Sequence, residues 1–88
     1  DEAFFELAGL LFPLELRARA PGDRLRNSAG SRKVKKIMLE HRIPLRQREA
    51  MPVLVDARGE VLWVPGVARS TDAAPKAGAP SLRVRILP

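Results

Sequence analysis

Two segments of the chain alternate between apolar and polar residues, strictly over 14–19 and as far as residue 86 in the second segment. Residues 14–19 read Leu-Glu-Leu-Arg-Ala-Arg, and residues 81–87 read Ser-Leu-Arg-Val-Arg-Ile-Leu. Alternation with a period of two places every second side chain on a core and the others in water. The pattern therefore predicts two half-buried strands, over about 14–19 and 81–87.

A β-hairpin is predicted between these two strands. Residues 52–55 (Pro-Val-Leu-Val) and residues 60–65 (Glu-Val-Leu-Trp-Val-Pro) are apolar runs of strand length, separated by the turn residues Asp-Ala-Arg-Gly. Gly59 can supply the positive φ that such a loop requires. Together the predicted strands make a small antiparallel β core.

Helical periodicity occurs in the middle of the chain. Apolar residues and one histidine recur there at i, i+3, i+4 and i+7, namely Val34, Ile37, Met38 and His41. The spacing predicts a basic helix over about 31–41 with one buried stripe and with Ser31 as its N-cap. Pro44 suits the first position of a second, short helix over about 44–50.

The remaining segments are predicted to be turns and loops. Pro21-Gly22-Asp23 is typical of a turn. Residues 25–30 fit a loop, and residues 70–80, which are rich in Ala, Pro and Gly, fit a surface loop. Residues 3–12 are mainly apolar and fit either a strand or a short helix. A chain of 88 residues is one small domain, so we expect a single α+β domain over 1–88.

The composition excludes several kinds of chemistry. The chain has no cysteine and one histidine, which rules out disulfides, thiolate catalysis and the usual zinc sites. His41 is expected to be structural or to cap its helix, and Asp23 and Asp56 are expected to cap turns rather than to form an acid–base pair. The longest apolar run, residues 7–14, falls far short of the roughly 20 residues that cross a membrane. We therefore predict no catalytic residue, no metal site and no membrane partner.

Positive charge is segregated along the chain. The net charge is +6, but residues 17–48 carry eleven basic and two acidic residues, so the remainder is net negative. Such a basic half indicates a polyanionic partner, although a solvated arginine-rich surface would have the same composition. The chain has three Phe, one Trp and no Tyr, and Trp63 is expected in the core. Single-stranded RNA is usually bound by stacking its bases on aromatic side chains, of which this chain has few. The composition therefore favours duplex RNA as the partner, which is recognised through phosphates, 2′-OH groups and shape.

The basic residues are densest around the predicted start of the first helix. Free N–H groups at a helix N-terminus favour a phosphate, and the loop 28–31 would lead into that terminus. If strands 14–19 and 81–87 pair in one sheet, their arginines join the same patch. This region is the predicted phosphate-binding surface.

Five short motifs occur in a fixed order within residues 14–70. They are Pro21-Gly22-Asp23-Arg24, Lys33-Val34-Lys35-Lys36, Arg42-Ile43-Pro44, Met51-Pro52-Val53-Leu54-Val55-Asp56 and Trp63-Val64-Pro65-Gly66. Each motif is weak alone, but the ordered set resembles the C-terminal domain of the bacterial tRNA(Ile)-lysidine synthetase family. Residues 70–80 match nothing in that family, and the arginine-rich turn 46–50 lacks the aromatic residue often found there.

The resemblance implies a function for the chain. The full enzyme of that family uses ATP with Mg to activate the wobble cytidine of the isoleucine tRNA that bears a CAU anticodon. Lysine then displaces AMP and gives lysidine. This ligase chemistry belongs to an N-terminal domain with an S-G-G-x-D-S loop, which the sequence lacks. The chain would accordingly have no catalytic role and no cofactor of its own.

The resemblance also implies a place for the chain within a cytoplasmic tRNA-modifying enzyme. Residue 1 is not Met, as expected for a piece of a longer protein. The piece would bind the acceptor stem of the tRNA and help to select the substrate. Its expected fold is α+β with an antiparallel β core, related to a domain in the β subunit of bacterial phenylalanyl-tRNA synthetase.

Candidate tRNA contacts follow from the same resemblance and from charge. By position, the first candidates are Arg24 of the Gly-Asp-Arg motif and the basic-helix residues Lys33, Lys35 and Lys36. Arg19 and Arg26 come next, and Arg32 is a candidate because it lies beside the same loop. Other motif residues are expected to shape the turn or the core: Gly22, Asp23, Trp63, Pro65 and Gly66.

A second interpretation gives the chain little RNA affinity. The apolar residues Phe4, Phe5 and 10–12 could dock on the parent's own catalytic domain or on a second copy of the chain. The domain would then be an interdomain-docking or dimerisation module. Salt-dependent RNA binding and a concentration-dependent mass distinguish the two interpretations.

Overall fold

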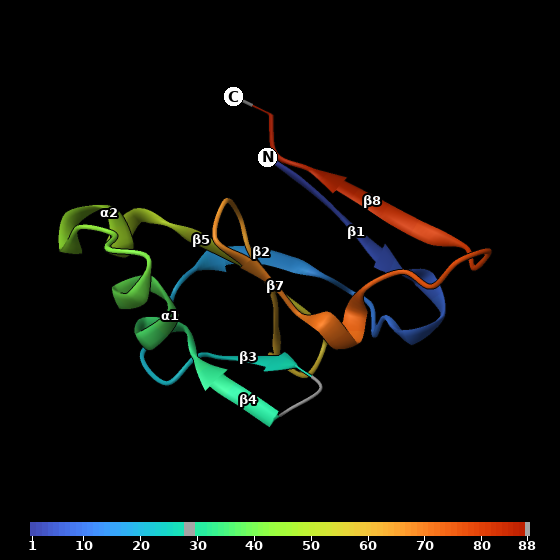
Figure 1. The fold of residues 1–88 in the computed structure, drawn as a ribbon, viewed down its shortest axis with the longest axis horizontal. Coiled ribbons are helices and arrows are strands. Elements are labelled where there is room, and N and C mark those ends of the chain that lie inside the picture. The colour runs from blue at the N-terminus through green and yellow to red at the C-terminus, as the bar shows by residue number, and fades with distance from the viewer. Residues whose placement is uncertain (28–29, 88) are drawn as a thin grey trace.

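A mixed sheet forms the centre of the computed structural model, which describes residues 1–27 and 30–87 (Figure 1). All neighbouring strands are antiparallel except β3 and β6, which are parallel. The strands follow the order β2 (Glu15–Ala18), β5 (Pro52–Val55), β6 (Val61–Val64), β3 (Arg24–Asn27) and β4 (Gly30–Lys33), with β7 (Ala68–Arg69) beside β6. The predicted strand over 14–19 and the predicted α+β class are confirmed.

A separate two-stranded ribbon is formed by β1 (Glu2–Glu6) and β8 (Ser81–Arg85). The predicted strand over 81–87 is confirmed as β8, but it pairs with β1 and not with the strands of the main sheet. Ala3 and Phe5 give β1 a buried face, so the N-terminal segment provides β8 with its own partner. As a result, the arginines of β2 and β8 lie in different sheets, so the pairing that was expected to join them does not occur.

The prediction of a loop over 25–30 is wrong, because residues 24–27 and 30–33 form a β-hairpin. Residues 24–27 are β3, which pairs with β4; residues 28 and 29 lie outside the described residues. Leu25 is buried, whereas its neighbours Arg24 and Arg26 are exposed. The segment contains only one large apolar residue, Leu25, with an arginine on either side. A single apolar position shows no period, so the hydrophobic pattern could not predict this strand.

Two short helices follow this hairpin, α1 (Val34–Glu40) and α2 (Leu45–Ala50). Helix α1 starts later than predicted because residues 31–33 complete β4. Ser31 is therefore not its N-cap, and Lys33 takes that position.

The predicted buried stripe of α1 is confirmed for three of its four residues. Val34, Ile37 and Met38 are buried. His41 is exposed, contrary to prediction, because the helix ends at Glu40 and His41 follows it. Its Nδ1 lies 2.9 Å from the carbonyl oxygen of Ile37, so His41 caps the helix end, as its alternative role predicted.

The main sheet separates two apolar clusters. The cluster beneath α1 comprises Leu25, Val34, Ile37, Met38, Val53, Val55, Val61 and Val64. The cluster beneath the ribbon comprises Ala3, Phe5, Leu54, Leu62 and Trp63. A β-bulge in β6 allows this division. Leu54 pairs with Trp63, but Val55 pairs with Val61, so Leu62 is the extra residue. The successive residues Leu62 and Trp63 consequently both pack in the cluster beneath the ribbon.

Trp63 joins the ribbon to the sheet. It is 4% exposed, as predicted for a core residue. Its ring meets the Phe5 ring edge-on, with 6.2 Å between centroids. Such aromatic pairs contribute roughly 0.5–1.5 kcal/mol beyond the area they bury. The only tryptophan of the chain is therefore a reporter for the folded core.

The predicted hairpin between β5 and β6 is confirmed, together with the capping role of Asp56. The Asp56 carboxylate accepts hydrogen bonds from the backbone N–H of Arg58 at 2.9 Å and of Glu60 at 3.1 Å. Gly59 has φ 84°, the positive value that this turn was expected to need.

Candidate nucleic-acid interface

The β3–β4 hairpin places cations at the edge of the main sheet. Strand β4 is the outermost strand, and all of its residues are exposed. Arg24 is opposite Lys33, and Arg26 is opposite Ser31. Residues opposite one another in an antiparallel pair point to the same face, so three cations share one face of the hairpin.

Arg24 is oriented by the partner strand. Its Nε donates to Ser31 Oγ at 2.8 Å, and its Nη2 donates to the Ser31 carbonyl oxygen at 3.2 Å. Because both acceptors are neutral, the charge of Arg24 is not compensated by them. A groove of about 320 Å³ runs beside it, lined by Arg24, Ser31, Gly22, Asp23, Arg26 and Glu60 among others. Arg24 therefore offers an anion a fixed guanidinium at a concave surface.

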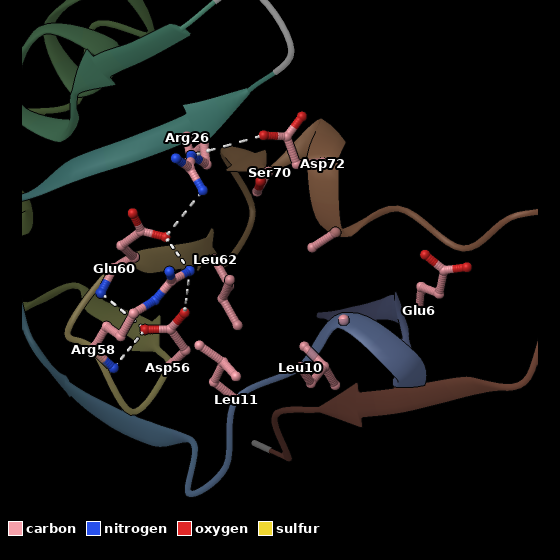
Figure 2. Close-up of a pocket in the computed structure, with 12 residues that line it drawn as sticks. Glu6, Leu10, Leu11, Arg26, Asp56, Arg58, Glu60, Leu62, Ser70 and Asp72 are labelled. Atoms are coloured by element: carbon pink, nitrogen blue, oxygen red, sulfur yellow. Dashed lines mark hydrogen bonds and ion pairs between the residues drawn. The ribbon is translucent and has the colours of Figure 1, made fainter.

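Arg26 points into a network of carboxylates (Figure 2). Its guanidinium lies 3.8 Å from Glu60 and 4.0 Å from Asp72. Arg58 links Glu60, at 3.1 Å, to Asp56, at 3.8 Å. A phosphate would have to compete with these acids for Arg26, so Arg26 is a weaker anion ligand than Arg24.

A small pocket lies beside this network. It has a volume of about 100 Å³, and Leu10, Leu11 and Leu62 line it opposite the charged residues (Figure 2). Ligand clefts usually have volumes of about 300–1,000 Å³. The pocket is therefore too small for a nucleotide substrate, and its charged wall joins β3 to the β5–β6 turn and to the 3₁₀ turn at Thr71–Ala73.

Arg32 is also paired with an acid. Its Nη2 donates to Glu40 in an ion pair that joins β4 to α1. This hydrogen bond lowers the pKa of Glu40 below its ordinary value, and the charges of Arg32, Lys36 and His41 lower it further. The pair fixes the hairpin against the helix and reduces the charge that Arg32 offers to a partner.

Arg17 and Asp23 hold the turn that precedes β3. Two Arg17 N–H groups donate to the carboxylate at 2.9 and 3.0 Å, and the Ala20 N–H donates at 2.8 Å. Burial raises the pKa of Asp23, but these hydrogen bonds and the charges of Arg17 and Arg19 outweigh it and lower the pKa. Asp23 therefore shapes the turn, as predicted.

Arg19 is only partly available to a ligand. Its side chain is half-buried. Its Nε is buried and has no hydrogen-bond partner within residues 1–27 and 30–87. Its positive charge acts on Asp23 and so supports the turn.

Lys33, Lys35 and Lys36 are exposed around the start of α1. Lys35 and Lys36 project away from the buried stripe, as the periodicity predicted. None of these lysines makes an ion pair with an acid in the described part of the chain. We define the hairpin–helix surface as the exposed cations of β3, β4 and α1 that form no ion pair in the described part of the chain: Arg24, Lys33, Lys35 and Lys36.

The predicted phosphate site at a helix N-terminus is not formed as expected. Residues 30 and 31 belong to β4, which separates them from the start of α1, and residues 28 and 29 lie outside the described residues. The Val34 N–H donates to the Asp23 carbonyl oxygen at 2.9 Å. The candidate interface consequently depends on side-chain cations rather than on free helix N–H groups.

Two other features are absent from the described residues: a membrane-spanning helix and a cluster of metal-binding side chains. Within them, no helix is long and apolar enough to cross a membrane. No group of three or more His, Asp or Glu residues suited to a metal ion occurs there either.

These features define a class: a small α+β domain with helices and a β-ribbon on opposite faces of a mixed sheet and a basic hairpin at its edge. The family model described as "TilS substrate C-terminal domain" matches residues 14–86. A solved structure described as a TILS C-terminal domain superimposes with a TM-score of 0.80 at 35% identity, covering 94% of this chain and 65% of that one. The chain belongs to the TilS C-terminal domain family, and the predicted resemblance is confirmed.

Relatives with known names agree with this assignment. The tRNA(Ile)-lysidine synthase of Bacillus subtilis is 44% identical over 61 residues, which cover 67% of this chain and 13% of that protein. The synthase of Shouchella clausii is 39% identical over 72 residues, covering 80% and 15%. The bifunctional protein TilS/HprT of Listeria monocytogenes is 43% identical over 63 residues, covering 69% and 10%. The chain thus spans about a tenth to a seventh of these relatives.

The same fold occurs in a second kind of protein. An N-terminal fragment of the phenylalanyl-tRNA synthetase β subunit from Pyrococcus horikoshii superimposes with a TM-score of 0.69 at 15% identity, covering 93% of this chain and 26% of that one. At this identity the likeness concerns the fold alone.

Proposed function

We propose that this chain is the tRNA-binding domain of an ATP-dependent, cytoplasmic ligase that forms lysidine at the wobble cytidine of the isoleucine tRNA with a CAU anticodon. In that enzyme the domain binds the acceptor-stem region and helps to select the substrate. Family membership supports the parent enzyme. The observation that carries the binding role is the hairpin–helix surface, whose four cations lie on three consecutive elements and form no ion pair within the described chain.

The surface suits the backbone of duplex RNA. Duplex RNA presents phosphates and 2′-OH groups over a wide, shallow groove, and proteins recognise it mainly by shape and charge. Two of the aromatic residues, Phe5 and Trp63, are buried in the core, so they cannot stack on bases. Lysine and arginine side chains on the edge hairpin and α1 would therefore orient the stem through its phosphates.

Chemistry is assigned to the rest of the parent enzyme. ATP with Mg would activate the cytidine there, and lysine would be the second substrate. The sequence of this chain lacks the S-G-G-x-D-S loop expected for ATP, and its carboxylates Asp23 and Asp56 are used as turn caps. The role of this domain would be to hold the tRNA near the catalytic domain. Because the two domains are linked, binding by this domain raises the effective concentration of the tRNA at the catalytic domain, even if the isolated domain binds weakly.

Salt dependence tests the proposal. Each phosphate contact contributes about 0.7–0.9 to the slope of log K against log salt, so four contacts give a slope of about −3 and a loss of roughly 60-fold between 50 and 200 mM salt. The measurement is fluorescence anisotropy of labelled isoleucine tRNA titrated with this chain. A mismatched-stem tRNA tests whether the domain also selects the stem.

Paired variants locate the binding surface. Replacing Lys35 and Lys36 by Glu should abolish most of the affinity and flatten the salt slope, while circular dichroism shows a folded domain. Lys76→Glu is the control for a single charge reversal away from the surface, because Lys76 is an exposed lysine in the 70–80 loop. Unchanged affinity of the folded double variant would disprove the role of this surface.

A docking or dimerisation module is the second candidate function. Its support is the set of exposed apolar side chains near the N-terminus, with Phe12 55% exposed and Leu16 48% exposed. Phe5 does not belong to it, because Phe5 is fully buried. A mass that rises with protein concentration and ignores salt, together with no RNA binding at low salt, would favour this function.

A further inference from the structure

Arg42 follows the C-terminal end of α1 and is the one non-glycine residue with positive φ in the described chain, at 55°. Its N–H donates to the Leu39 carbonyl oxygen at 3.0 Å, and the Ile43 N–H donates to the Met38 carbonyl oxygen at 3.1 Å. This pair of hydrogen bonds is a Schellman motif with Arg42 at its left-handed position. Glycine is the usual residue there, because any side chain makes that conformation unfavourable.

The Arg42 side chain contributes few contacts to the fold. Arg42 is exposed, and its guanidinium makes neither an ion pair nor a hydrogen bond within the described residues. A cation near a helix C-terminus interacts favourably with the helix dipole, but this effect is small for an exposed charge and is screened by salt. A strained backbone position that keeps a large, solvated cation suggests a role outside the fold.

Arg42 follows the cations of β4 and α1 along the chain. A helix of seven residues is about 10 Å long, so Lys33 and Arg42 mark the two ends of α1, with Lys35 and Lys36 between them. Arg46 is exposed on α2, the next element along the chain (Figure 1). Neither Arg42 nor Arg46 is paired with an acid in the part of the chain that the structure describes. Arg26 and Arg32, by contrast, are so paired.

We propose that Arg42 and Arg46 bind phosphates of the same RNA as the hairpin–helix surface, so that the interface extends from β4 along α1 to the α1–α2 corner. This inference rests on the proposed RNA-binding function and adds two contacts to it. It also explains why arginine occupies a position at which glycine would give a more favourable backbone.

Arg42→Gly separates a binding role from a structural role. Glycine relieves the strain at positive φ, so the midpoint of thermal unfolding should stay the same or rise. Loss of one phosphate contact should lower the salt slope by about one and weaken RNA binding roughly sixfold at 0.1 M salt, which is a slope contribution of about 0.8 over one decade below 1 M. Arg42→Lys should retain most of the affinity, and Arg46→Ala should resemble Arg42→Gly in binding.

Controls make the outcome decisive. Arg85→Ala on β8 removes an exposed cation that is unpaired in the described chain and lies on the ribbon; it should leave the affinity and the slope unchanged. If Arg42→Gly proves unstable, Arg42→Asn keeps a residue that tolerates positive φ and serves as the binding test. A fall in stability for both variants would show that the Arg42 charge stabilises α1, and would overturn the proposal.

Failure of this inference is distinct from failure of the proposed function. Suppose that Arg42→Gly leaves the affinity and the salt slope unchanged, while replacing Lys35 and Lys36 by Glu weakens binding. The interface would then not extend beyond α1 to Arg42, and the proposed function would stand. An equal loss in Arg85→Ala would indicate general charge attraction and would overturn the added contacts. Failure of the unaltered chain to bind tRNA at low salt would overturn both.

Discussion

Replacing Asp23 by alanine should destabilise the domain by about 2 kcal/mol. The change removes three hydrogen bonds to one carboxylate: two from Arg17, at 2.9 and 3.0 Å, and one from the Ala20 N–H, at 2.8 Å. Hydrogen bonds to charged groups contribute about 1.5–3 kcal/mol. The side chain of Asp23 is 9% exposed and that of Arg17 is 28% exposed, so partial screening places the expected loss toward the lower end of that range.

Trp63 fluorescence during urea unfolding measures this loss. A loss of about 2 kcal/mol is a large part of the stability of a small domain and should lower the melting temperature by roughly 8–16 °C. Asp23→Asn keeps an acceptor for the Ala20 N–H and should lose about half as much. Asp72→Ala is the control, because Asp72 is exposed and 4.0 Å from Arg26. A loss below about 0.5 kcal/mol for Asp23→Ala would refute the role given to this turn.

The same carboxylate predicts a pH dependence. The pKa of Asp23 is lowered in the folded chain, so its contribution to stability is present above the ordinary carboxyl pKa and is lost as the pH falls through the folded value. The stability difference between the unaltered chain and Asp23→Asn should therefore be full at pH 7 and shrink below about pH 4. A difference that is constant from pH 7 to pH 3 would contradict the assigned ion pair.

Three further outcomes follow from the contacts described. Phe5→Ala removes a fully buried ring and should cost about 3–5 kcal/mol in urea unfolding; a loss below about 1 kcal/mol would show that the ribbon is not part of the core. Arg24→Ala should weaken RNA binding more than Arg26→Ala in anisotropy titrations, because carboxylates already engage Arg26; the reverse order would contradict that argument. Glu40→Gln removes the acid paired with an arginine of β4 and should strengthen RNA binding and steepen its salt slope, whereas weaker binding would mean that the pair organises the interface.

Local patterns predicted the parts of the fold whose apolar residues are close in sequence. Strand β2 and the stripe of α1 each contain several apolar residues at one period, and the β5–β6 hairpin consists of two apolar runs separated by turn residues. The β3–β4 hairpin contains one large buried residue, Leu25, so no period could be read from it. The pairing of β8 with β1 depends on residues about 80 positions apart, and alternation within a strand does not specify its partner.

The sequence shows which residues carry a charge, but it could not predict which of these charges form ion pairs in the folded chain. Arg26 meets Glu60 and Asp72 through the tertiary fold, and such distant pairs leave no mark in local spacing. Arg42 was visible as part of a basic segment and of a family motif, but its left-handed backbone depends on where α1 ends. That end could be located only within a few residues from the pattern.

Chemical-shift mapping tests the central claim most directly. The ¹⁵N-labelled chain is titrated with an RNA minihelix that reproduces the acceptor stem, at low salt, and the backbone amide signals are followed. The account predicts that the largest shifts lie in residues 30–36 and at the α1–α2 corner, and that β1 and β8 change little. Shifts concentrated on the ribbon, or none at saturating RNA, would contradict it.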